Sequence, residues 1–493
     1  MVTLAACMLG GCQTQNNKAS GEEMKGYFYN PLDINYGIGD PWLYRHSDGY
    51  YYYTHSMTGV VKVTKTKSPT LLRENDGDEA RTKVIFRQKS INVVEIWAPE
   101  VFFFEGRWYC YFTATDAALP DAASKDAGRR IYGMKSKTED IFGEWETAVK
   151  IALPDDTRSI DATFFAYNGH QYIVYAGWKN KYNDQYIQNL YINELETGNP
   201  LKVAASETSR HLISEPDREW EQIGAKQNEG PAMSFAPDGT PVLLYSGAYS
   251  GADYYCIGYL KLVGSDLLNQ NSWQKGDKPL METDVNVSVN PEASEIIAPG
   301  HNSVFKSPDG KEDWICYHSA KYSGAGWDRQ VRLQKMTWNG NTPVVEKIFR
   351  ASDPAPLPSG DTAKRYKFEA EFATLTSDCF AIDQEGYASN DRSVSINDNG
   401  TIRFDVAVPE NGQYAVGVRY SNRDKVTDKI TLKINGREEE IVAPKTLYDD
   451  TFFVSWIFTD LYIKASGPNA IEVQADSSIL IDCLLIDYLD HNA

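Results

Sequence analysis

A loose repeat in the first 320 residues constrains the fold of this chain more than any other feature. Five times a turn glycine leads into an apolar run that carries a tyrosine, and these tyrosines follow one another at intervals of 58 to 72 residues. They are Tyr53, Tyr111, Tyr175, Tyr245 and Tyr317. Runs of this kind are typical of β-strands, and radial repetition of four-stranded units is typical of β-propellers. The repeat therefore predicts a five-bladed β-propeller over residues 26–350.

The composition and the hydrophobic pattern of the sequence change after Arg350. Residues 351–365, ASDPAPLPSGDTAKR, are rich in proline and small polar residues, as inter-domain linkers are. Short alternating strands such as TIRFDVAV and GQYAVGVRY follow within residues 366–493. We expect an independent β-sandwich of the jelly-roll type in this region, so that the whole chain is all-β.

One polar or aromatic residue recurs 13 to 16 positions before each repeat tyrosine. These residues are Asp40, Trp97, Asp161, Glu229 and His301. Because the innermost strand of every blade lines the central channel, equivalent positions of five blades converge on one place. Three carboxylates that converge repel one another, which keeps one acid protonated while another stays ionised. Glycoside hydrolysis needs a pair of that kind.

Each of these carboxylates taken singly has a simpler interpretation. Asp40 precedes a proline and Glu229 precedes a Gly-Pro pair, and acidic residues are common at such places in turns. A triad of carboxylates can also bind a metal ion such as calcium. The shared register of the five units favours a single catalytic site over both alternatives.

The motifs around these residues resemble glycoside hydrolase family 43. They are GDPW around Asp40, WAPEV from Trp97, SIDATFF around Asp161, NEGP around Glu229, GHNSVF around His301 and DRQVRLQ from Asp328. The resemblance covers residues 26–350 and implies a five-bladed propeller that hydrolyses glycosides with inversion of the anomeric centre. It implies that Asp40 is the general base, that Glu229 is the general acid, and that Asp161 sets the pKa and the orientation of that acid.

The same resemblance implies contacts to the substrate. His301 matches a channel histidine that in several members of the family holds a central ion or water. Arg329 matches an arginine that contacts the terminal sugar, with Arg332 as the nearby alternative. Trp97 is expected in the sugar-binding wall, and a core tryptophan is the alternative interpretation.

Members of this family cleave α-L-arabinofuranosides and β-D-xylosides, and some act on arabinan or β-1,3-galactan. We favour an exo-acting α-L-arabinofuranosidase on plant cell-wall polysaccharide side chains or oligosaccharides, from the overall style of NEGPAMSF and GHNSVF. A β-D-xylosidase and an exo-β-1,3-galactanase are the alternatives within the family. A non-catalytic, glycan-binding surface lipoprotein is the alternative of another class, and the intact triad of Asp40, Asp161 and Glu229 argues against it.

The C-terminal region resembles carbohydrate-binding module family 6. The resemblance rests on FEAEFATL, VRYSN, KING and GPNAIEV, which lie between residues 368 and 473. It implies a β-sandwich with a structural calcium ion held by Glu369, Glu371 and Asp482, with Asp487 as the alternative to Asp482. Carboxylate oxygens are ligands that calcium prefers, and ordinary surface acids are the alternative interpretation.

Residues 1–25 resemble a bacterial lipoprotein signal and its tether. The run MVTLAACMLGGC ends in Cys12, which would be the lipidated residue, and a polar stretch follows it. We therefore expect a cell-envelope lipoprotein, periplasmic or on the outer-membrane surface, which reaches the membrane only through its lipid anchor. A frayed apolar terminus is the alternative interpretation.

The charge of the chain bears on its partners. The net charge is −19, and a surface that binds phosphates needs the opposite sign, so we expect no nucleic acid partner. The five cysteines outside the signal are scattered along the chain, which argues against a disulfide framework and against a zinc site. The expected partner is a polysaccharide or oligosaccharide, bound by a monomer.

Overall fold

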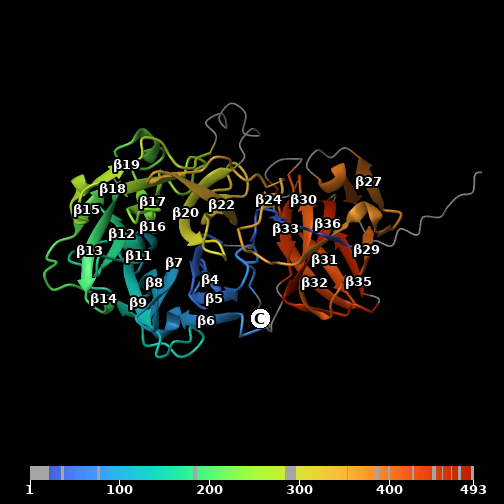
Figure 1. Cartoon of the computed structure of the whole chain (residues 1–493), viewed down its shortest axis with the longest axis horizontal. Helices are drawn as coiled ribbons and strands as arrows, with labels where there is room; N and C mark the ends of the chain where they lie inside the picture. Colours follow the sequence, from blue (N-terminus) through green and yellow to red (C-terminus); the bar gives the residue numbers. More distant parts are fainter. Residues whose placement is uncertain are drawn as a thin grey trace, which may run out of the picture.

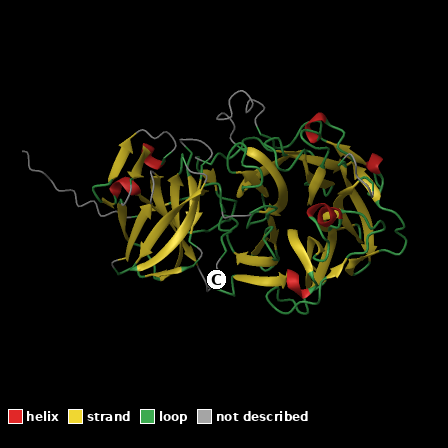
Figure 2. Cartoon of the chain, turned by 180° about the vertical axis from the view of Figure 1, so that it is seen from behind, coloured by secondary structure: helices red, strands yellow, loops and turns green. Residues whose placement is uncertain are grey.

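A computed structural model describes most of the chain. The described residues are 21–34, 38–74, 78–180, 186–283, 296–351, 353–383, 388–397, 400–424, 427–446, 451–457, 459–467, 469–475 and 479–489. Cys12, the predicted lipidation site, lies outside them. The described part is all-β, as predicted, with one α-helix, α1 (Ala122–Ala127), and a few 3-10 turns (Figure 2). Within it, no helix has the length and the apolar character needed to cross a membrane.

Five antiparallel sheets follow one another between residues 42 and 344 (Figure 1). The first contains β3 (Trp42–Arg45), β4 (Tyr51–Thr54), β5 (Val60–Thr66) and β6 (Thr82–Arg87). The second contains β7 (Val93–Phe104), β8 (Arg107–Asp116), β9 (Arg130–Lys135) and β10 (Val149–Lys150). The third contains β11 (Ser159–Tyr167), β12 (His170–Trp178), β13 (Gln188–Glu196), β14 (Asn199–Val203) and β15 (His211–Ser214).

The remaining two sheets of this region have the same layout. The fourth contains β16 (Asn228–Phe235), β17 (Pro241–Gly247), β18 (Cys256–Leu262) and β19 (Trp273–Lys275). The fifth contains β20 (Ile297–Lys306), β21 (Asp313–Ala320), β22 (Arg329–Asn339) and β23 (Thr342–Val344). Short 3-10 turns join some of these strands, namely η1 (Gln88–Ser90), η2 (Glu219–Glu221) and η3 (Gln270–Ser272).

The five sheets are arranged in a cycle. Their first strands contact one another in the order β3, β7, β11, β16, β20 and back to β3. A separate apolar cluster fills the space between each pair of neighbouring sheets, including the pair formed by the fifth and the first. The repeat tyrosines lie on the second strand of each sheet and are fully buried in this packing. They therefore mark the repeat because each fills an equivalent place in the core.

Two further sheets form the C-terminal region. The larger one contains β1 (Glu22–Glu23), β25 (Arg365–Glu369), β36 (Ile479–Leu489), β28 (Arg392–Ile396), β27 (Cys379–Asp383), β30 (Gly412–Ser421), β33 (Phe453–Trp456) and β34 (Leu461–Ile463). The smaller one contains β26 (Thr374–Leu375), β29 (Thr401–Val406), β35 (Asn469–Ala475), β31 (Thr427–Ile434) and β32 (Arg437–Pro444). Apolar side chains of both sheets share one core, and the 3-10 turns η6 (Ala370–Phe372) and η7 (Ser389–Asp391) lie at its edge.

The segments expected as tether and linker are more ordered than the sequence suggests. β1, within the predicted tether, pairs with β25, so the chain enters the C-terminal sheet before it forms the first of the five sheets. β2 (Tyr27–Phe28) pairs with β24 (Ala355–Pro356), which lies inside the predicted linker 351–365. β25 begins at Arg365, one residue before the expected boundary. The proline-rich composition suggested a linker without strands. Buried backbone N–H and C=O groups have to be hydrogen-bonded, however, and the short strands β1, β2 and β24 provide these bonds.

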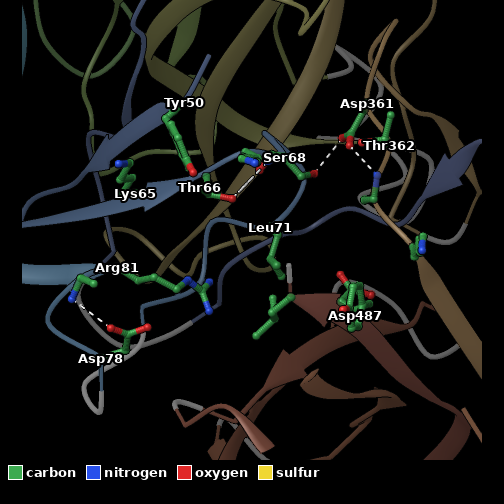
Figure 3. A pocket seen from close by; sticks show the side chains of 16 residues that line it. Tyr50, Lys65, Thr66, Ser68, Leu71, Asp78, Arg81, Asp361, Thr362 and Asp487 are labelled. Carbon is green, nitrogen blue, oxygen red and sulfur yellow. Dashed lines mark hydrogen bonds between the residues drawn. The ribbon is translucent and has the colours of Figure 1, made fainter. Parts of the chain in front are cut away.

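Polar contacts hold the C-terminal region against the first sheet. Ser68 Oγ donates to Asp361 Oδ2 at 2.7 Å (Figure 3). Arg73 and Arg81 both form ion pairs with Asp460, and the Arg73 side chain is almost fully buried. Figure 3 shows the cavity of about 540 Å³ at this junction, between β5, the segment around Asp361 and the end of β36. The two regions are thus joined by buried charges as well as by strand pairing.

Candidate active site

Each of the five innermost segments has a residue with a positive φ angle at an equivalent place, and β7 and β20 each have a second one nearer their start. The values are 54° at Asp40, 44° at Ala98, 55° at Asp161, 55° at Gly230 and 37° at His301. The strand register shifts around four of these positions, in β7, β11, β16 and β20. Residues other than glycine adopt this conformation only at a cost, and such outliers gather at functional sites. The bulges turn the local side chains toward the middle of the cycle.

The backbone N–H of each of these residues donates to a side chain of the preceding sheet in the cycle. The acceptors are His318 Nδ1 for Asp40 at 3.0 Å, Ser56 Oγ for Ala98 at 2.8 Å, Thr113 Oγ1 for Asp161 at 3.1 Å, Asp161 Oδ2 for Gly230 at 3.2 Å and Ser246 Oγ for His301 at 2.7 Å. These bonds replace the ladder bonds that a bulge removes, so every bulge is held by its neighbour.

This register corrects the spacing argument made from the tyrosines. Trp97 and Glu229 lie one residue before the positions equivalent to Asp40, Asp161 and His301. The structure nevertheless brings the three predicted carboxylates together, since Asp40 and Asp161 both lie beside His301 Nδ1 and Asp161 accepts the N–H of the residue after Glu229. The positions counted back from the tyrosines were one residue too early at Trp97 and Glu229. The reason is that a β-bulge inserts an extra residue into a strand, and the sequence does not show where.

Asp40 is the carboxylate most strongly surrounded by positive charge. Its Oδ1 lies 3.1 Å from His301 Nδ1 and 3.5 Å from Arg329 Nη1. Ser56 Oγ donates to its Oδ2 at 2.5 Å. Burial raises the pKa of a carboxyl, but His301 and Arg329 outweigh it and hold the pKa of Asp40 well below its ordinary value. Asp40 is therefore ionised at neutral pH and suited to accept a proton.

Asp161 has the opposite behaviour. It is buried, and this burial together with the charges of Glu229 and Asp40 raises its pKa to about 7, although His301 acts in the other direction. Its Oδ2 accepts the N–H of Gly230, the residue that follows Glu229. Asp161 thus fixes the backbone next to Glu229 and contributes its negative charge to the same place.

Glu229 is held by two neutral donors. Tyr255 Oη donates to its Oε1 at 2.9 Å, and Gln188 Nε2 donates to its Oε2 at 2.7 Å. Its side chain is nearly buried, and no cation forms an ion pair with it among the described residues. Asp40 and Glu229 therefore lie in the same site in contrasting environments, one with cations and one with neutral hydrogen-bond donors.

Comparison with known families identifies the first region. The profile of glycosyl hydrolases family 43 matches residues 29–343, which is most of the part that contains the five sheets. The chain belongs to this family.

Two named arabinofuranosidases are similar to about two thirds of the chain. The chain is 33% identical over 324 residues to an extracellular exo-α-(1→5)-L-arabinofuranosidase of Streptomyces avermitilis. The aligned residues make up 64% of this chain and 62% of that protein. It is also 30% identical over 346 residues to α-L-arabinofuranosidase 43 of Humicola insolens. There the aligned residues make up 68% of this chain and 65% of that protein. The chain thus spans less than two thirds of the length of either relative.

A solved structure also resembles about two thirds of this chain. The crystal structure of an α-L-arabinofuranosidase from Lactobacillus brevis superposes with a TM-score of 0.56 and 27% identity. It covers 68% of this chain and 98% of that chain, so the superposition leaves about a third of this chain unmatched.

The remaining predicted contacts of the family 43 site are placed as follows. Arg329 contacts Asp40, whereas the alternative Arg332 is fully buried beside the Phe349 carbonyl. Trp97 is half-buried and the Arg129 guanidinium lies 3.1 Å from the centroid of its ring. The stacked arginine covers that face of Trp97.

His301 is the predicted channel histidine, and its charge decides what it can bind. Burial lowers the pKa of an imidazole, but Asp40 and Asp161 raise the pKa of His301 to about 9. Its Nδ1 also lies 3.9 Å from Asp161 Oδ2. An imidazolium already supplies the positive charge at this place, so the residues present do not fit a second cation at His301.

Sequence reasoning missed several residues that support the site. His318 accepts the N–H of Asp40, and burial and Arg329 hold its pKa well below the ordinary value, so it stays neutral. Its ring is stacked on Tyr255 with centroids 5.8 Å apart. His318 and Ser246 directly follow two of the repeat tyrosines, so a polar residue at that place was the available signal for these two.

Glu100, in the WAPEV motif, is a fourth carboxyl near the site. It is buried, and this burial, with the charge of Asp161 as a smaller cause, raises its pKa well above the ordinary value. Nothing in the sequence singles it out from the rest of its motif.

The predicted metal ligands lie at one edge of the C-terminal sheets. Ser389 Oγ donates to Glu369 at 2.6 Å and to Asp482 at 2.9 Å, and Asn390 Nδ2 donates to Glu371 at 2.8 Å. Glu369 and Asp482, with the Cys483 thiol, lie close enough together to share an ion.

The alternative ligand Asp487 does not join this group. It pairs with Arg365, at the other end of β25 from Glu369, in a buried bidentate ion pair. Its charge is therefore already balanced, five residues away from Asp482 along β36.

Proposed function

We propose that this protein is an inverting, exo-acting α-L-arabinofuranosidase. The observation that carries the proposal is the contrast between Asp40, whose negative charge is fixed by His301 and Arg329, and Glu229, whose partners Tyr255 and Gln188 are neutral. Direct displacement at a sugar carbon needs one carboxylate that accepts a proton and one carboxyl that donates one.

The chemistry follows from these environments. Asp40 removes a proton from a water molecule as that water attacks the anomeric carbon, and Glu229 protonates the departing glycosidic oxygen. Asp161 fixes the backbone after Glu229 by accepting the N–H of Gly230. Arg329 lies next to Asp40 and is available to bind hydroxyls of the terminal sugar.

The choice of sugar is supported by the relatives. The proteins from Streptomyces avermitilis and Humicola insolens are both named arabinofuranosidases, and the former is named for exo action on α-(1→5) linkages. Plant cell-wall arabinan side chains and the oligosaccharides derived from them are the substrates that such an activity would meet.

A panel of 4-nitrophenyl glycosides tests the proposal. We expect the wild-type protein to hydrolyse the α-L-arabinofuranoside faster than the β-D-xyloside and the β-D-galactoside, and NMR to show the inverted anomer first. Glu229→Gln should lose roughly 10²–10⁴-fold in kcat on arabino-oligosaccharides, because an amide cannot donate the proton. A faster xyloside or galactoside would assign another activity of the family. A retained anomer would rule out the mechanism, and glycan binding without hydrolysis would indicate a binding protein.

We also propose a domain organisation. Residues 26–350 would form a five-bladed β-propeller, because five sheets in a cycle with five intervening apolar clusters leave no open edge between neighbours. Residues 366–493 would form a β-sandwich of the jelly-roll type, related to carbohydrate-binding module family 6, because two sheets share one core there. Limited proteolysis that releases a folded C-terminal fragment would support two domains.

We propose further that Glu369, Glu371 and Asp482 hold a structural calcium ion. Oxygen donors suit calcium, and Oε2 of Glu371 is buried without a hydrogen-bond partner among the described residues. Lys367 lies 2.6 Å from Glu369, and Arg419 pairs with Asp482, so two of the three carboxylates are already neutralised. Glu371 is the carboxylate left to contribute a negative charge to the ion, and thermal unfolding with EDTA and with added calcium tests the proposal.

The cellular location is also a proposal. Relatives from two Streptomyces species are named extracellular, which supports a secreted or cell-surface protein. We propose a monomer anchored in the cell envelope, periplasmic or on the outer surface, through a lipid on Cys12. Metabolic labelling with a fatty acid should mark the wild-type protein and not Cys12→Ala.

A further inference from the structure

Exposed aromatic rings gather on the loops that surround the proposed active site. Tyr249 is 36% exposed, Trp327 is 59% exposed and Tyr186 is 66% exposed. They belong to the loops that join the second and third strands of the fourth, fifth and third sheets, respectively. Single exposed apolar residues are common, but several on adjacent loops mark a surface that something covers. We call these three residues the aromatic rim.

The rim is tied directly to the residues proposed for catalysis. Ser250, next to Tyr249, accepts a hydrogen bond through its carbonyl oxygen from Arg329 Nη2 at 2.8 Å. The same loop ends in Tyr255, which donates to Glu229. Trp327 is two residues from Arg329 in sequence. One loop thus positions an exposed ring, the arginine and the general acid together.

The Tyr249–Trp327 pair is fixed before any ligand binds. Their ring centroids are 5.9 Å apart at an interplanar angle of 75°. Trp327 Nε1 donates to Ser250 Oγ at 3.3 Å, and Asp253 accepts hydrogen bonds from Ser323 Oγ at 2.6 Å and from the Gly324 N–H at 2.9 Å. These bonds join the two loops, so the rings lose little further freedom when a ligand packs on them.

A hollow lies beside the rim on the side of Glu229. Its volume is about 690 Å³, and it is lined by Tyr186, Gln222, Gly224, Ala225, Lys226, Gln227 and Tyr249. Gln227 is two residues before Glu229, and its Oε1 is buried with no hydrogen-bond partner among the described residues. The lining contains aromatic faces, amides and one lysine but no carboxylate, which suits neutral sugar rings with hydroxyl groups.

We propose that the aromatic rim and this hollow bind the leaving-group part of a neutral oligosaccharide or polysaccharide chain. The proposal rests on the proposed function, because it takes Glu229 as the acid that protonates the departing oxygen. The departing chain then leaves the site on the Glu229 side, where the hollow lies. The flat C–H faces of its sugars pack on Tyr249 and Trp327, and their hydroxyls reach Gln227 and Gln222. The enzyme would therefore prefer chains over single-sugar glycosides.

Substrates of different length test the proposal on Tyr249→Ala and Trp327→Ala. The substrates are methyl α-L-arabinofuranoside, which has no sugar in its leaving group, and α-(1→5)-linked arabinotriose. We expect kcat/KM on the trisaccharide to fall about tenfold in each variant, mainly because KM rises. The fold-loss on the trisaccharide should be at least five times the fold-loss on the methyl glycoside. Trp327→Phe keeps a flat ring and should restore most of the loss. Phe380→Ala, which removes an exposed ring from β27 in the C-terminal region, is the matched control and should change neither value.

Equal losses on both substrates would show that the rings only support the fold of the loops, and would overturn the proposal. Unchanged kinetics in both variants would overturn it as well. Calorimetric titration of arabinotriose into Glu229→Gln, with and without Trp327→Ala, separates the rim from the catalytic assignment. Weaker binding in the double variant supports the rim even if the wild-type protein hydrolyses neither substrate, and that second result would reject the proposed function alone.

Discussion

The Nδ1 atom of His301 lies 3.1 Å from Oδ1 of Asp40, and this pair separates the protonation states of the two aspartates in the site. His301 holds a proton because Asp40 and Asp161 raise its pKa to about 9, and in return it keeps Asp40 ionised. The pKa of Asp161 is instead raised, to about 7, so Asp161 binds a proton at a much higher pH than Asp40 does. Two aspartates that share one histidine thus differ in charge at mildly acidic pH.

Replacing His301 should move the acidic limb of the pH–activity profile. His301→Gln removes the cation that holds the pKa of Asp40 low, so this pKa rises and Asp40 is protonated at a higher pH. We expect the acidic limb of kcat/KM to shift upward by about one pH unit or more, with a larger loss at pH 5 than at pH 8. His170→Gln changes an exposed histidine paired with Glu194 and serves as control. An unshifted limb would show that His301 does not set the charge of Asp40.

Neutralising Asp161 should stabilise the protein at alkaline pH while removing activity. The pKa of Asp161 is about 7 in the folded protein and about 4 in an unfolded chain, so folding is penalised as pH rises through this interval. Asp161→Asn has no such penalty. Its free energy of unfolding should exceed that of the wild type by ~1–2 kcal/mol at pH 8 and match it near pH 3. Urea unfolding at both values checks this, and a variant that is less stable at pH 8 would contradict it.

Ser56 should matter for both stability and activity. Its hydroxyl accepts the N–H of Ala98 at 2.8 Å and donates to Asp40 at 2.5 Å. Ser56→Ala leaves a buried N–H without a partner and should cost about 1–3 kcal/mol of stability. Ser246→Ala removes the equivalent acceptor from the His301 N–H without touching Asp40, so it should cost similar stability but less kcat. Chemical denaturation and kcat measurements on both variants compare the two effects.

The buried ion pairs at the junction should couple the two regions of the chain. Asp460→Ala leaves Arg73 and Arg81 without the carboxylate they share, and one of these arginines is almost fully buried. We expect a loss of about 3 kcal/mol and two separated transitions in differential scanning calorimetry. Glu472→Ala breaks a more exposed ion pair with Arg403 and should change stability by less than about 1 kcal/mol. A single unshifted transition in Asp460→Ala would show that the junction does not depend on these charges.

The all-β architecture was readable from the sequence because its signals are local. Turn glycines such as Gly49 and Gly106 have positive φ angles, and the runs after them form strands. The tyrosines repeat because each fills an equivalent buried place. The strands inside the tether and the linker were not readable, since β1 and β24 are only two residues long and exist through their distant partners.

The sequence by itself indicated the residues of the candidate site, namely Asp40, Asp161, Glu229, His301 and Arg329, through the motifs around them, with Arg332 left as the alternative to Arg329. Only the tertiary structure decided their charges and their support. The hydrogen-bond partners of these carboxylates, Tyr255 for Glu229 and His318 for Asp40, come from another strand hairpin and from another sheet, 26 and 278 residues away along the chain. A pKa depends on burial and on charges a few ångströms away, and no local pattern encodes either.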